Sequence, residues 1–188
     1  MNNKAIIFSA PSGAGKTTIV RALLEQHLPL EFSISATSRE PRGKEVHGKD
    51  YYFLGINGFK VAIENDQLLE WEEVYPDQFY GTLHSETKRI WSKNKAVLFD
   101  VDVYGGIEVK KQLGDNAISI FVMPPSIEEL ERRLIHRGTE SDDKVQIRLG
   151  KAKQEIALSD RFDVIIVNED LESAIYEAAK TVKSFLGI

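Results

Sequence analysis

The chain has 188 residues, of which 42% are apolar, and its formal net charge at pH 7 is −5. This length fits one domain, or one core with small insertions, and the apolar share is large enough to build that core. The acidic balance disfavours general binding to nucleic acid, and the absence of cysteine excludes disulfides and thiol chemistry.

The N-terminal residues Met1–Lys4 lack the charged start and the long apolar stretch of a signal peptide. No apolar run approaches the ~20 residues that a membrane helix needs. We therefore expect a cytoplasmic protein without a nucleic-acid or membrane partner. The sequence leaves open whether the chain forms a homo-oligomer.

The first element in chain order is a short apolar run, Ala5–Phe8, which leads into a loop that ends in Gly15-Lys16-Thr17. A helical pattern follows, and this order of strand, loop and helix is typical of a phosphate-binding loop (P-loop), in which backbone N–H groups point into one hollow. Lys16 would reach the β- and γ-phosphates, and the Thr17 hydroxyl would ligate Mg²⁺. The residues expected to bind the donor nucleotide here are Ala10, Pro11, Ser12, Gly13, Ala14, Gly15, Lys16, Thr17 and Thr18.

Ala10 departs from the consensus G-x-x-x-x-G-K-[ST], whose first residue is glycine. A plain turn between strand and helix is the alternative interpretation of this loop. Such a turn needs one residue with positive φ, however, and does not need two glycines followed by Lys-Thr. Because alanine disfavours positive φ and Pro11 fixes the next φ, we predict a negative φ for Ala10.

Three further apolar runs are predicted to form buried parallel strands, namely Ala96–Val101, Ala117–Val122 and Asp163–Val167. They are short, rich in Ile, Val and Phe, and mostly without alternation, as expected of strands covered on both faces. Helical patterns such as Thr17–His27 separate the strands. The sequence therefore predicts an α/β fold with a doubly wound, mostly parallel sheet. We assign its core to about residues 1–32, 88–126 and 159–188.

Two later helix starts carry capping signals. Ser126-Ile-Glu-Glu129 is a capping box, in which the Ser126 hydroxyl accepts from the backbone N–H three residues on. Asp170 is predicted to cap the last helix, whose apolar residues recur at helical spacing as far as Leu186.

Two stretches interrupt the alternation of strands and helices. Residues 33–87 are polar and aromatic and are too long for a simple connection, so we interpret them as an inserted binding module with short strands and a small helix near Phe59–Asn65. Residues 127–158 carry many basic side chains, most of which we expect to be solvated charges on a pair of helices. Arg137 and Arg148 flank a turn at Arg137-Gly138-Thr139 and could swing towards a phosphate.

The inserted stretch resembles the guanylate kinase family, whose pattern is F-S-x-S-x-T-T-R-x-P-R followed by G-E-x-x-G-x-D-Y-x-F. The matching residues are Phe32-Ser-Ile-Ser-Ala-Thr-Ser-Arg39-Glu-Pro41-Arg42 and Glu45-Val-His-Gly48-Lys-Asp50-Tyr51-Tyr-Phe. The likeness continues in order over nearly the whole chain, through Glu70-Trp71, Tyr80-Gly81-Thr82, Leu98-Phe-Asp100-Val-Asp102, Pro124-Pro125-Ser, Arg137-Gly138-Thr139 and Val167-Asn168-Glu-Asp170. This ordered set is far more specific than the phosphate loop alone.

The resemblance implies a P-loop NTPase fold of one domain, with a GMP-binding insertion at about residues 33–87 and a helical lid at about residues 127–158. It implies the reaction ATP + GMP → ADP + GDP, with dGMP as a further acceptor and Mg²⁺ as cofactor. The small-molecule partners would be ATP and GMP or dGMP, and the role would lie in purine nucleotide metabolism and GMP recycling.

Guanine itself supports this interpretation, because it presents O6 as an acceptor and N1–H and an amino group as donors. Glu70 and Asp100 would accept from N1–H and from the amino group. The hydroxyls of Ser35 and Thr82 would serve O6 or the amino group, in the roles that the family gives those positions. Adenine would instead place its acceptor N1 against a carboxylate. The alternative for Glu70 is a surface charge at a helix end.

The acceptor phosphate needs a binding site of its own. Arg39 and Arg42 are three residues apart around Pro41, and guanidinium forks bind phosphate oxygens bidentately. Tyr51 and Tyr80 would add hydroxyl donors, and the family uses the matching arginines and tyrosines on the GMP phosphate. Without the motif, solvated loop charges and packing tyrosines would be the preferred interpretation.

Asp100 and Asp102 end a predicted strand at its carboxyl end, where ligands bind in open α/β sheets. Asp102 is a candidate for holding Mg²⁺ through water, and a cap of a helix or loop is an equal alternative. Asn168 resembles the family position near the adenine of ATP, or is an ordinary residue of a strand-end turn. The residues expected to offset charge on the transferring phosphoryl group are Lys16, Arg39, Arg42, Arg137 and Arg148.

Two other functions remain open from the sequence. A related kinase that phosphorylates a phosphorylated sugar would keep the phosphate loop but would not need Glu70, Asp100, Ser35 and Thr82 together. A guanylate-kinase-like module that binds peptides and lacks catalysis would tend to lose loop residues such as Lys16, which is present here.

Overall fold

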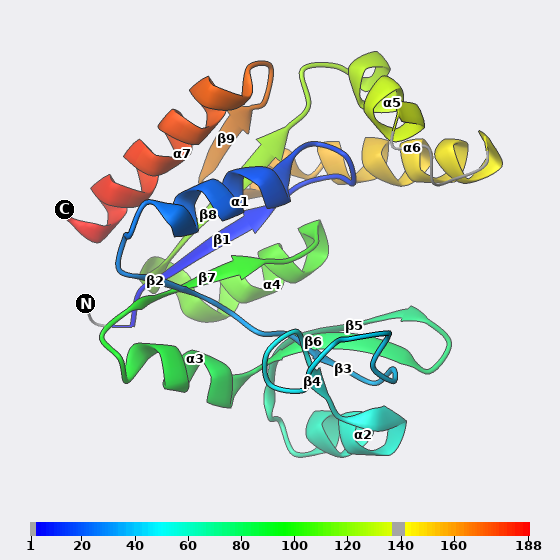
Figure 1. Cartoon of the computed structure of the whole chain (residues 1–188), viewed down its shortest axis with the longest axis vertical. Coiled ribbons are helices and arrows are strands. Elements are labelled where there is room, and N and C mark those ends of the chain that lie inside the picture. Colours follow the sequence, from blue (N-terminus) through cyan, green and yellow to red (C-terminus); the bar gives the residue numbers. More distant parts are fainter. Residues whose placement is uncertain (1–2, 137–141) are drawn as a thin grey trace.

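The computed structural model describes residues 3–136 and 142–188. Its helices and strands alternate along most of the chain and form a central sheet with a smaller sheet beside it (Figure 1). None of the described helices is long and apolar enough to cross a membrane. In chain order the elements are β1 (Ala5–Ser9), α1 (Lys16–Glu25), β2 (Leu30–Phe32), β3 (Ala36–Thr37), β4 (Tyr52–Phe53), α2 (Gly55–Glu64), β5 (Leu68–Tyr75), β6 (Gln78–Leu83), α3 (His84–Trp91), β7 (Ala96–Asp100), α4 (Val103–Leu113), η1 (Gly114–Asn116), β8 (Ala117–Met123), α5 (Ile127–His136), α6 (Asp142–Ile156), η2 (Ser159–Arg161), β9 (Val164–Val167) and α7 (Leu171–Leu186).

The central sheet has the strand order β2-β7-β1-β8-β9, and all of its pairings are parallel. Four of its strands match the four apolar runs that the sequence singled out. The expected burial is wrong for the run that forms β9, because β9 lies at an edge of the sheet and leaves Ile165 42% and Val167 50% exposed. The fifth, β2, lies at the edge of the sheet and is only three residues long, too short to give a pattern in the sequence. The predicted α/β fold with a mostly parallel sheet is confirmed.

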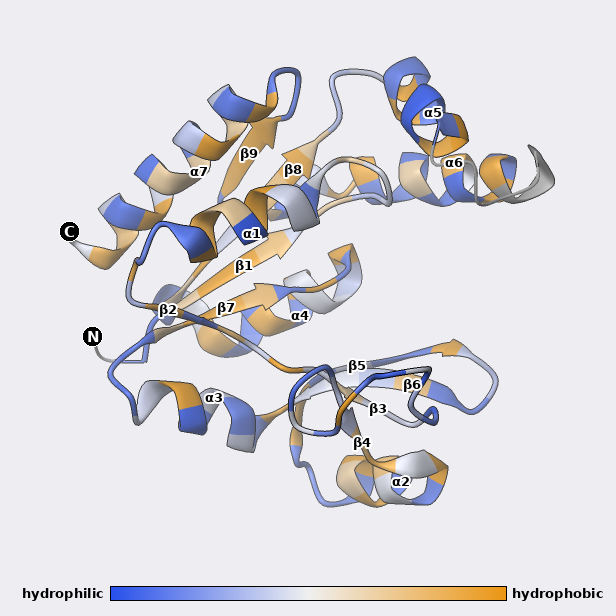
Figure 2. Ribbon diagram, viewed as in Figure 1, coloured by the Kyte–Doolittle hydropathy of each residue, from blue (hydrophilic) through white to orange (hydrophobic). Residues whose placement is uncertain are grey.

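Helices cover both faces of this sheet. On one face, Ile6 and Phe8 of β1 belong to a buried cluster with α1 and α7. On the other face, Ile7 packs in a second cluster that includes residues of α3 and α4, and Figure 2 shows the apolar strands between the helices. Each fully buried Ile or Phe side chain contributes about 1.5–3 kcal/mol to folding, so the two clusters hold the strand ends firmly in place.

A second sheet, in the order β4-β3-β6-β5, lies beside the first and packs against α2. Phe59 of α2 stacks on Phe79 of β6 with 5.4 Å between ring centroids, and both side chains are buried. The small helix predicted near Phe59–Asn65 begins earlier, at Gly55, and ends at Glu64. Its buried face is formed by Phe59 and Ala62, whereas Ile56 in the first turn is exposed, so the first turn gave no clear apolar pattern.

The helices α5 and α6 form a small unit of their own, in which Leu130 and Leu134 pack against residues of α6. Both predicted caps are confirmed. The Glu129 N–H donates to Ser126 Oγ at 3.1 Å, and the Ser173 N–H donates to Asp170 Oδ1 at 2.8 Å. The predicted turn at Arg137-Gly138-Thr139 lies outside the described residues.

Candidate functional site

The loop between β1 and α1 has the backbone that its two glycines permit. Gly13 and Gly15 have φ values of 95° and 96°, a region that residues with a Cβ rarely adopt. The Ala14 N–H donates to the Pro11 carbonyl at 3.1 Å and tightens the turn between them. Ala10 does not adopt a positive φ, so the prediction made for it is confirmed.

Asn168, which follows β9, supports this loop from inside the protein. Its side-chain amide donates to the Ala14 carbonyl at 2.7 Å, and the residue is only 4% exposed. A Cβ placed on Gly15 would lie 2.2 Å from Asn168 Nδ2. Gly15 is therefore required both by its positive φ and by this close contact. Asn168 was predicted to lie near a bound adenine or in a strand-end turn; the structure gives it a further contact, with the phosphate loop.

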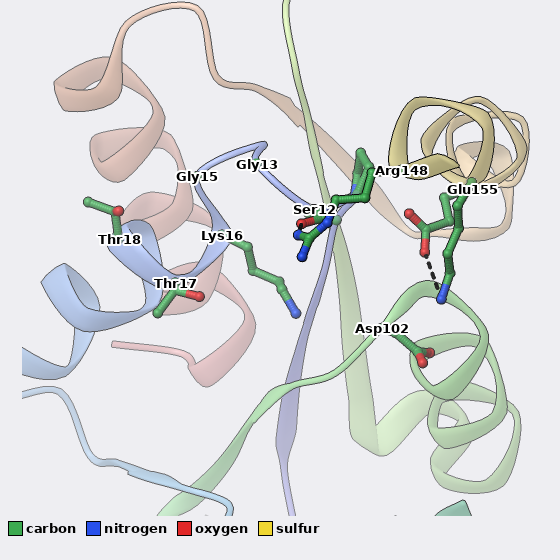
Figure 3. Close-up of a pocket in the computed structure, with 12 residues that line it drawn as sticks. Ser12, Gly13, Gly15, Lys16, Thr17, Thr18, Asp102, Arg148 and Glu155 are labelled. Atoms are coloured by element: carbon green, nitrogen blue, oxygen red, sulfur yellow. Dashed lines mark hydrogen bonds and ion pairs between the residues drawn. The ribbon is translucent and has the colours of Figure 1, made fainter. Parts of the chain in front are cut away.

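A cavity of about 340 Å³ opens above the loop (Figure 3). The N-terminus of α1 faces it, and Gly15, which precedes that helix, provides no side chain to cap the first N–H groups. Free N–H groups and the helix dipole favour an anion at such a place. The cavity is lined by Ala10, Pro11, Ser12, Gly13, Gly15, Lys16, Thr17, Thr18, Asp102, Arg148, Lys151 and Glu155.

Lys16 extends from α1 towards the carboxyl end of β7. Its ammonium group forms an ion pair with Asp100 and donates to the Val101 carbonyl at 2.7 Å. The Thr17 hydroxyl donates to the other oxygen of Asp100 at 3.4 Å. The loop and the end of β7 therefore meet at one carboxylate.

Arg148 reaches the same loop from α6. Its guanidinium donates to Ser12 Oγ at 2.8 Å, and Figure 3 shows these two side chains of the cavity lining next to each other. The structure thus brings this predicted arginine to the phosphate loop. Arg137, the other arginine predicted on the lid, lies outside the described residues.

A second cavity, of about 210 Å³, adjoins the first, because Asp102 lines both. Its walls come from the small sheet and from the end of β7. Among the residues predicted to bind the acceptor, Ser35, Tyr51, Glu70, Tyr80 and Asp100 line it; the remaining lining residues are Glu72, Val74, Gly81, Val101 and Asp102.

Glu70 is a buried carboxyl group in this second cavity. Thr82 Oγ1 donates to its Oε1 at 2.8 Å, which leaves Thr82 behind the carboxylate, outside the cavity lining. Burial, together with the negative charge of Asp102, raises the pKa of Glu70 to about 7, although the Thr82 hydrogen bond opposes the shift. Without a ligand, this group is therefore partly protonated at neutral pH.

Asp102 takes one of the two roles that the sequence left open. It caps α4, since its Oδ1 accepts from the Gly105 N–H at 2.7 Å. It also shares a hydrogen bond with Glu72, a residue that the sequence did not single out, and this bond and burial raise the pKa of Glu72. Gly105 allows this close packing, because a Cβ there would come within 3.2 Å of both Asp102 and Glu70.

Arg39 is held in place beside the second cavity. Its guanidinium forms two hydrogen bonds with Glu45, at 2.6 and 2.9 Å, and its Nε donates to the Tyr80 hydroxyl at 3.1 Å. It also lies 4.9 Å from the centroid of the Tyr51 ring. Glu45 belongs to the motif that carried the family resemblance, but its contact with Arg39 could not be read from the sequence.

The structure does not bring Arg42 to the cavity. Arg42 is exposed in the turn before Glu45, and its backbone N–H donates to Glu45 Oε2 at 2.8 Å. A third cavity, of about 520 Å³, is lined by Gly13 and by Arg132, Arg133 and His136 of α5. The sequence predicts solvated charges here, and Arg132 and His136 are indeed exposed, while Arg133 is partly exposed and donates to the Asn168 carbonyl at 3.1 Å.

Comparison with known proteins decides the family. The family model described as guanylate kinase matches residues 2–185. The chain belongs to the guanylate kinase family. It is 51% identical over 185 residues to guanylate kinase from Bacteroides fragilis, with 98% of this chain and 91% of that protein covered. It is 49% identical to the Porphyromonas gingivalis guanylate kinase, over 97% and 98% of the two chains.

A solved structure supports the same assignment. The crystal structure of guanylate kinase from Anaplasma phagocytophilum superposes with a TM-score of 0.74 at 30% identity and covers 96% of this chain and 85% of that one. The resemblance drawn from the motifs and the predicted fold class are both confirmed. The roles of individual site residues stay predictions.

Proposed function

We infer that this guanylate kinase family member transfers the γ-phosphoryl group of ATP to GMP and releases ADP and GDP. The observation that carries the inference is the pair of adjoining cavities, one on the phosphate loop and one lined by carboxyl and hydroxyl groups, which meet at Asp102. Two nucleotides bound there would place their phosphates towards each other at the carboxyl end of β7.

We assign the second cavity to guanine and to the sugar of GMP. Ionised Glu70 would accept from guanine N1–H and from the amino group, and Ser35 and Asp100 would supply the remaining polar contacts. Thr82 keeps the Glu70 carboxylate turned into the cavity by the 2.8 Å hydrogen bond. AMP would leave Glu70 facing a ring nitrogen that also accepts, so the buried carboxylate would lack its partners.

The acceptor phosphate would bind beside Arg39, Tyr51 and Tyr80. These groups already contact one another, and a phosphate would share the guanidinium with Glu45 or replace it. Arg42 would have to move to join them, because its side chain is exposed in the present conformation. Residues 33–87 would form the GMP-binding insertion and residues 127–158 the lid.

The transfer itself needs no protein nucleophile. An oxygen of the GMP phosphate attacks the γ-phosphorus, the bond to the bridging β–γ oxygen breaks, and ADP leaves with those electrons. Lys16 and Arg148 would offset the negative charge on the transferring group, and Arg137 would join them from the lid. Closure of the lid and the insertion would exclude water and limit hydrolysis of ATP.

The donor set at the end of β7 suits Mg²⁺. The Thr17 hydroxyl and the Asp102 carboxylate line the first cavity, and an Asp100 oxygen lies 3.4 Å from the Thr17 hydroxyl. Mg²⁺ prefers oxygen ligands and usually keeps several waters together with substrate phosphates, so Thr17 would hold it directly and Asp102 through water. When bound, it neutralises charge on the β- and γ-phosphates.

A panel of acceptors tests the proposed function. ADP release from ATP is measured in parallel with GMP, dGMP, AMP, CMP or UMP, all at saturating ATP and with Mg²⁺. We expect rapid release with GMP, release also with dGMP, and rates at least about a thousandfold lower with the other three. Equal rates with AMP and GMP, or ADP release that needs no acceptor, would rule out the proposal.

The pH dependence of GMP binding follows from Glu70. Because its pKa is about 7 in the free protein and guanine requires the ionised form, GMP binding expels the proton. Lowering the pH from 8 to 6 therefore reduces the ionised fraction from about nine-tenths to about one-tenth. We expect KM for GMP to rise about tenfold, while KM for ATP follows a shallower profile.

The GMP phosphate also titrates near pH 6, so the wild-type profile alone mixes two effects. A Glu70→Gln variant keeps the substrate titration and removes that of the carboxyl group. Its KM for GMP, although higher overall, should change less between pH 8 and 6 than that of the wild type. Identical slopes for the two proteins would mean that Glu70 is not the titrating group.

A further inference from the structure

A buried carboxylate on α3 joins two separate segments of the small sheet unit. The Glu86 side chain is 0% exposed. Its Oε1 accepts from the Ile34 N–H at 3.0 Å, and its Oε2 accepts from the Tyr52 hydroxyl at 2.8 Å. Ile34 lies where the chain crosses from β2 of the central sheet to β3 of the small sheet, and Tyr52 lies in β4.

Arg89, one turn further along α3, links this carboxylate to the central sheet. Its Nε and Nη2 each donate to Glu86 at 2.7 Å, and its Nη1 pairs with Glu31 of β2. Glu31 also accepts from Lys93 at 2.7 Å and from Lys95 at 3.2 Å. The network therefore runs from the edge of the central sheet, through α3, to both segments of the small sheet.

The two segments that Glu86 holds are walls of the second cavity. Ile34 directly precedes Ser35, and Tyr52 directly follows Tyr51, and both of these neighbours line the cavity. Ser33 cannot anchor this crossing by its own side chain, because its buried hydroxyl has no hydrogen-bond partner within the described part of the chain. Backbone hydrogen bonds hold the crossing at Ser33, whose N–H donates to the Leu98 carbonyl at 2.9 Å, and at Ser35, whose carbonyl accepts from the Tyr52 N–H at 2.8 Å; Glu86 adds a side-chain anchor between them, at Ile34.

Glu86 is charged when it makes these contacts. Burial would favour the protonated form, but the hydrogen bonds from Arg89, Ile34 and Tyr52 outweigh it and hold the pKa of Glu86 below its ordinary value. Hydrogen bonds to an ionised acceptor are about twice as strong as neutral ones, and a buried charge whose donors are removed is costly. Glu86 can thus hold the backbone at Ile34 and the side chain of Tyr52, each next to a residue that lines the cavity.

We propose that Glu86 is a positioning residue for the acceptor nucleotide: it fixes Ser35 and Tyr51 through their chain neighbours and thereby sets the affinity for GMP without touching it. The inference rests on the assignment of the second cavity to GMP. A role limited to general stability would weaken the whole fold and would not distinguish between the two substrates.

Three variants separate these roles. Glu86→Gln keeps the shape but removes the charge, and its amide cannot satisfy all of the donors. Tyr52→Phe removes one of the two contacts with the small sheet and keeps the ring. Glu31→Gln is the matched control, because Glu31 contacts Arg89, Lys93 and Lys95 of the same network but neither Ile34 nor Tyr52. Steady-state KM values for GMP and ATP and thermal unfolding are measured for each.

We expect KM for GMP to rise about tenfold in Glu86→Gln and about threefold in Tyr52→Phe, with KM for ATP within about twofold of wild type in both. Glu31→Gln should leave both KM values within about twofold, even where its unfolding temperature falls. A split between the two substrates of this kind is not expected from a loss of stability alone.

The proposal is overturned if Glu86→Gln leaves KM for GMP unchanged, if KM for ATP rises in parallel, or if Glu31→Gln has the same effect as Glu86→Gln. If Glu86→Gln does not fold, Tyr52→Phe decides: an unchanged KM for GMP contradicts the proposal. A wild-type protein that does not phosphorylate GMP would instead refute the proposed function, so the two failures are distinguishable.

Discussion

A Lys16→Ala variant is expected to lose about a thousandfold or more of its turnover with GMP. Lys16 is the cation that α1 places at the phosphate loop, where its ammonium group now pairs with Asp100 and bonds the Val101 carbonyl. In the complex it would move to the β- and γ-phosphates, where negative charge shifts as the bond to the leaving oxygen breaks. KM for GMP should change little, because Lys16 does not line the second cavity.

The measurement is the initial rate of ADP release at saturating ATP and GMP, with thermal unfolding to show that the variant is folded. Lys60→Ala is the control. Lys60 is an exposed lysine of α2 whose Nζ pairs with Asp77 Oδ1 at 2.8 Å, and it lines neither cavity. It should retain nearly full activity. A Lys16→Ala protein that kept more than a tenth of the wild-type rate would exclude the assigned role of Lys16.

A Glu70→Ala variant is expected to lose most of its preference for GMP over AMP. A site built to hydrogen-bond its substrate rejects an analogue without those groups by about 10⁴-fold or more, because buried partners are left unpaired. Removing the carboxylate should lower kcat/KM for GMP by about a hundredfold or more. The value for AMP should change much less, since AMP gains nothing from Glu70.

The readout is the ratio of kcat/KM for GMP to that for AMP, measured in one assay. Glu73→Ala is a matched control, because Glu73 is an exposed carboxylate on the same strand, β5, whose contact is with the Asp77 N–H in the hairpin turn. It should keep the wild-type ratio. If Glu70→Ala keeps that ratio as well, a residue other than Glu70 distinguishes guanine from adenine.

Local signals allowed much of the core and the phosphate loop to be predicted. The loop lies within one short segment, so its spacing of Gly13, Gly15 and Lys16 already determines which groups face the cavity. The strands β1, β7, β8 and β9 are short continuous apolar runs, which hydropathy detects, although the exposure of the edge strand β9 could not be predicted from its run. The caps Ser126 and Asp170 bond only three residues ahead, and such contacts are visible in the sequence.

Elements without a clear apolar pattern were not predicted. The helix α4 contains Gly105 and Gly106, which lower helix propensity by up to about 1 kcal/mol each. They are needed because a Cβ on Gly106 would lie 2.2 Å from Ser9 Oγ. The helix α3 buries Glu86 and Thr87 beside Ile90, so its inner face does not look apolar in the sequence.

Contacts between distant parts of the chain were also beyond sequence reasoning. The Glu72–Asp102 and Asn168–Ala14 hydrogen bonds each join residues far apart in the chain. Nothing in the local pattern of either partner indicates the other. The family resemblance identified which residues gather around the two cavities, but the groups that hold them in place emerge only from the three-dimensional packing.

Two buried or partly buried carboxyl groups of the site lower the stability of the folded protein at neutral pH. Glu70 and Glu72 have pKa values above those of free glutamate because they are held close to Asp102 and away from water. A raised carboxyl pKa means that the folded state favours the protonated form, so these groups reduce stability as the pH rises above about 4.5 and towards 7. Binding of guanine donors would give Glu70 the partners that it lacks in the free protein.

A crystal structure of the protein with GMP bound tests the central claim most directly. The account predicts that guanine N1–H and the amino group lie within hydrogen-bond distance of Glu70, with the phosphate against Arg39, Tyr51 and Tyr80. A guanine bound outside this cavity, or seated in it without contact to Glu70, would contradict the account.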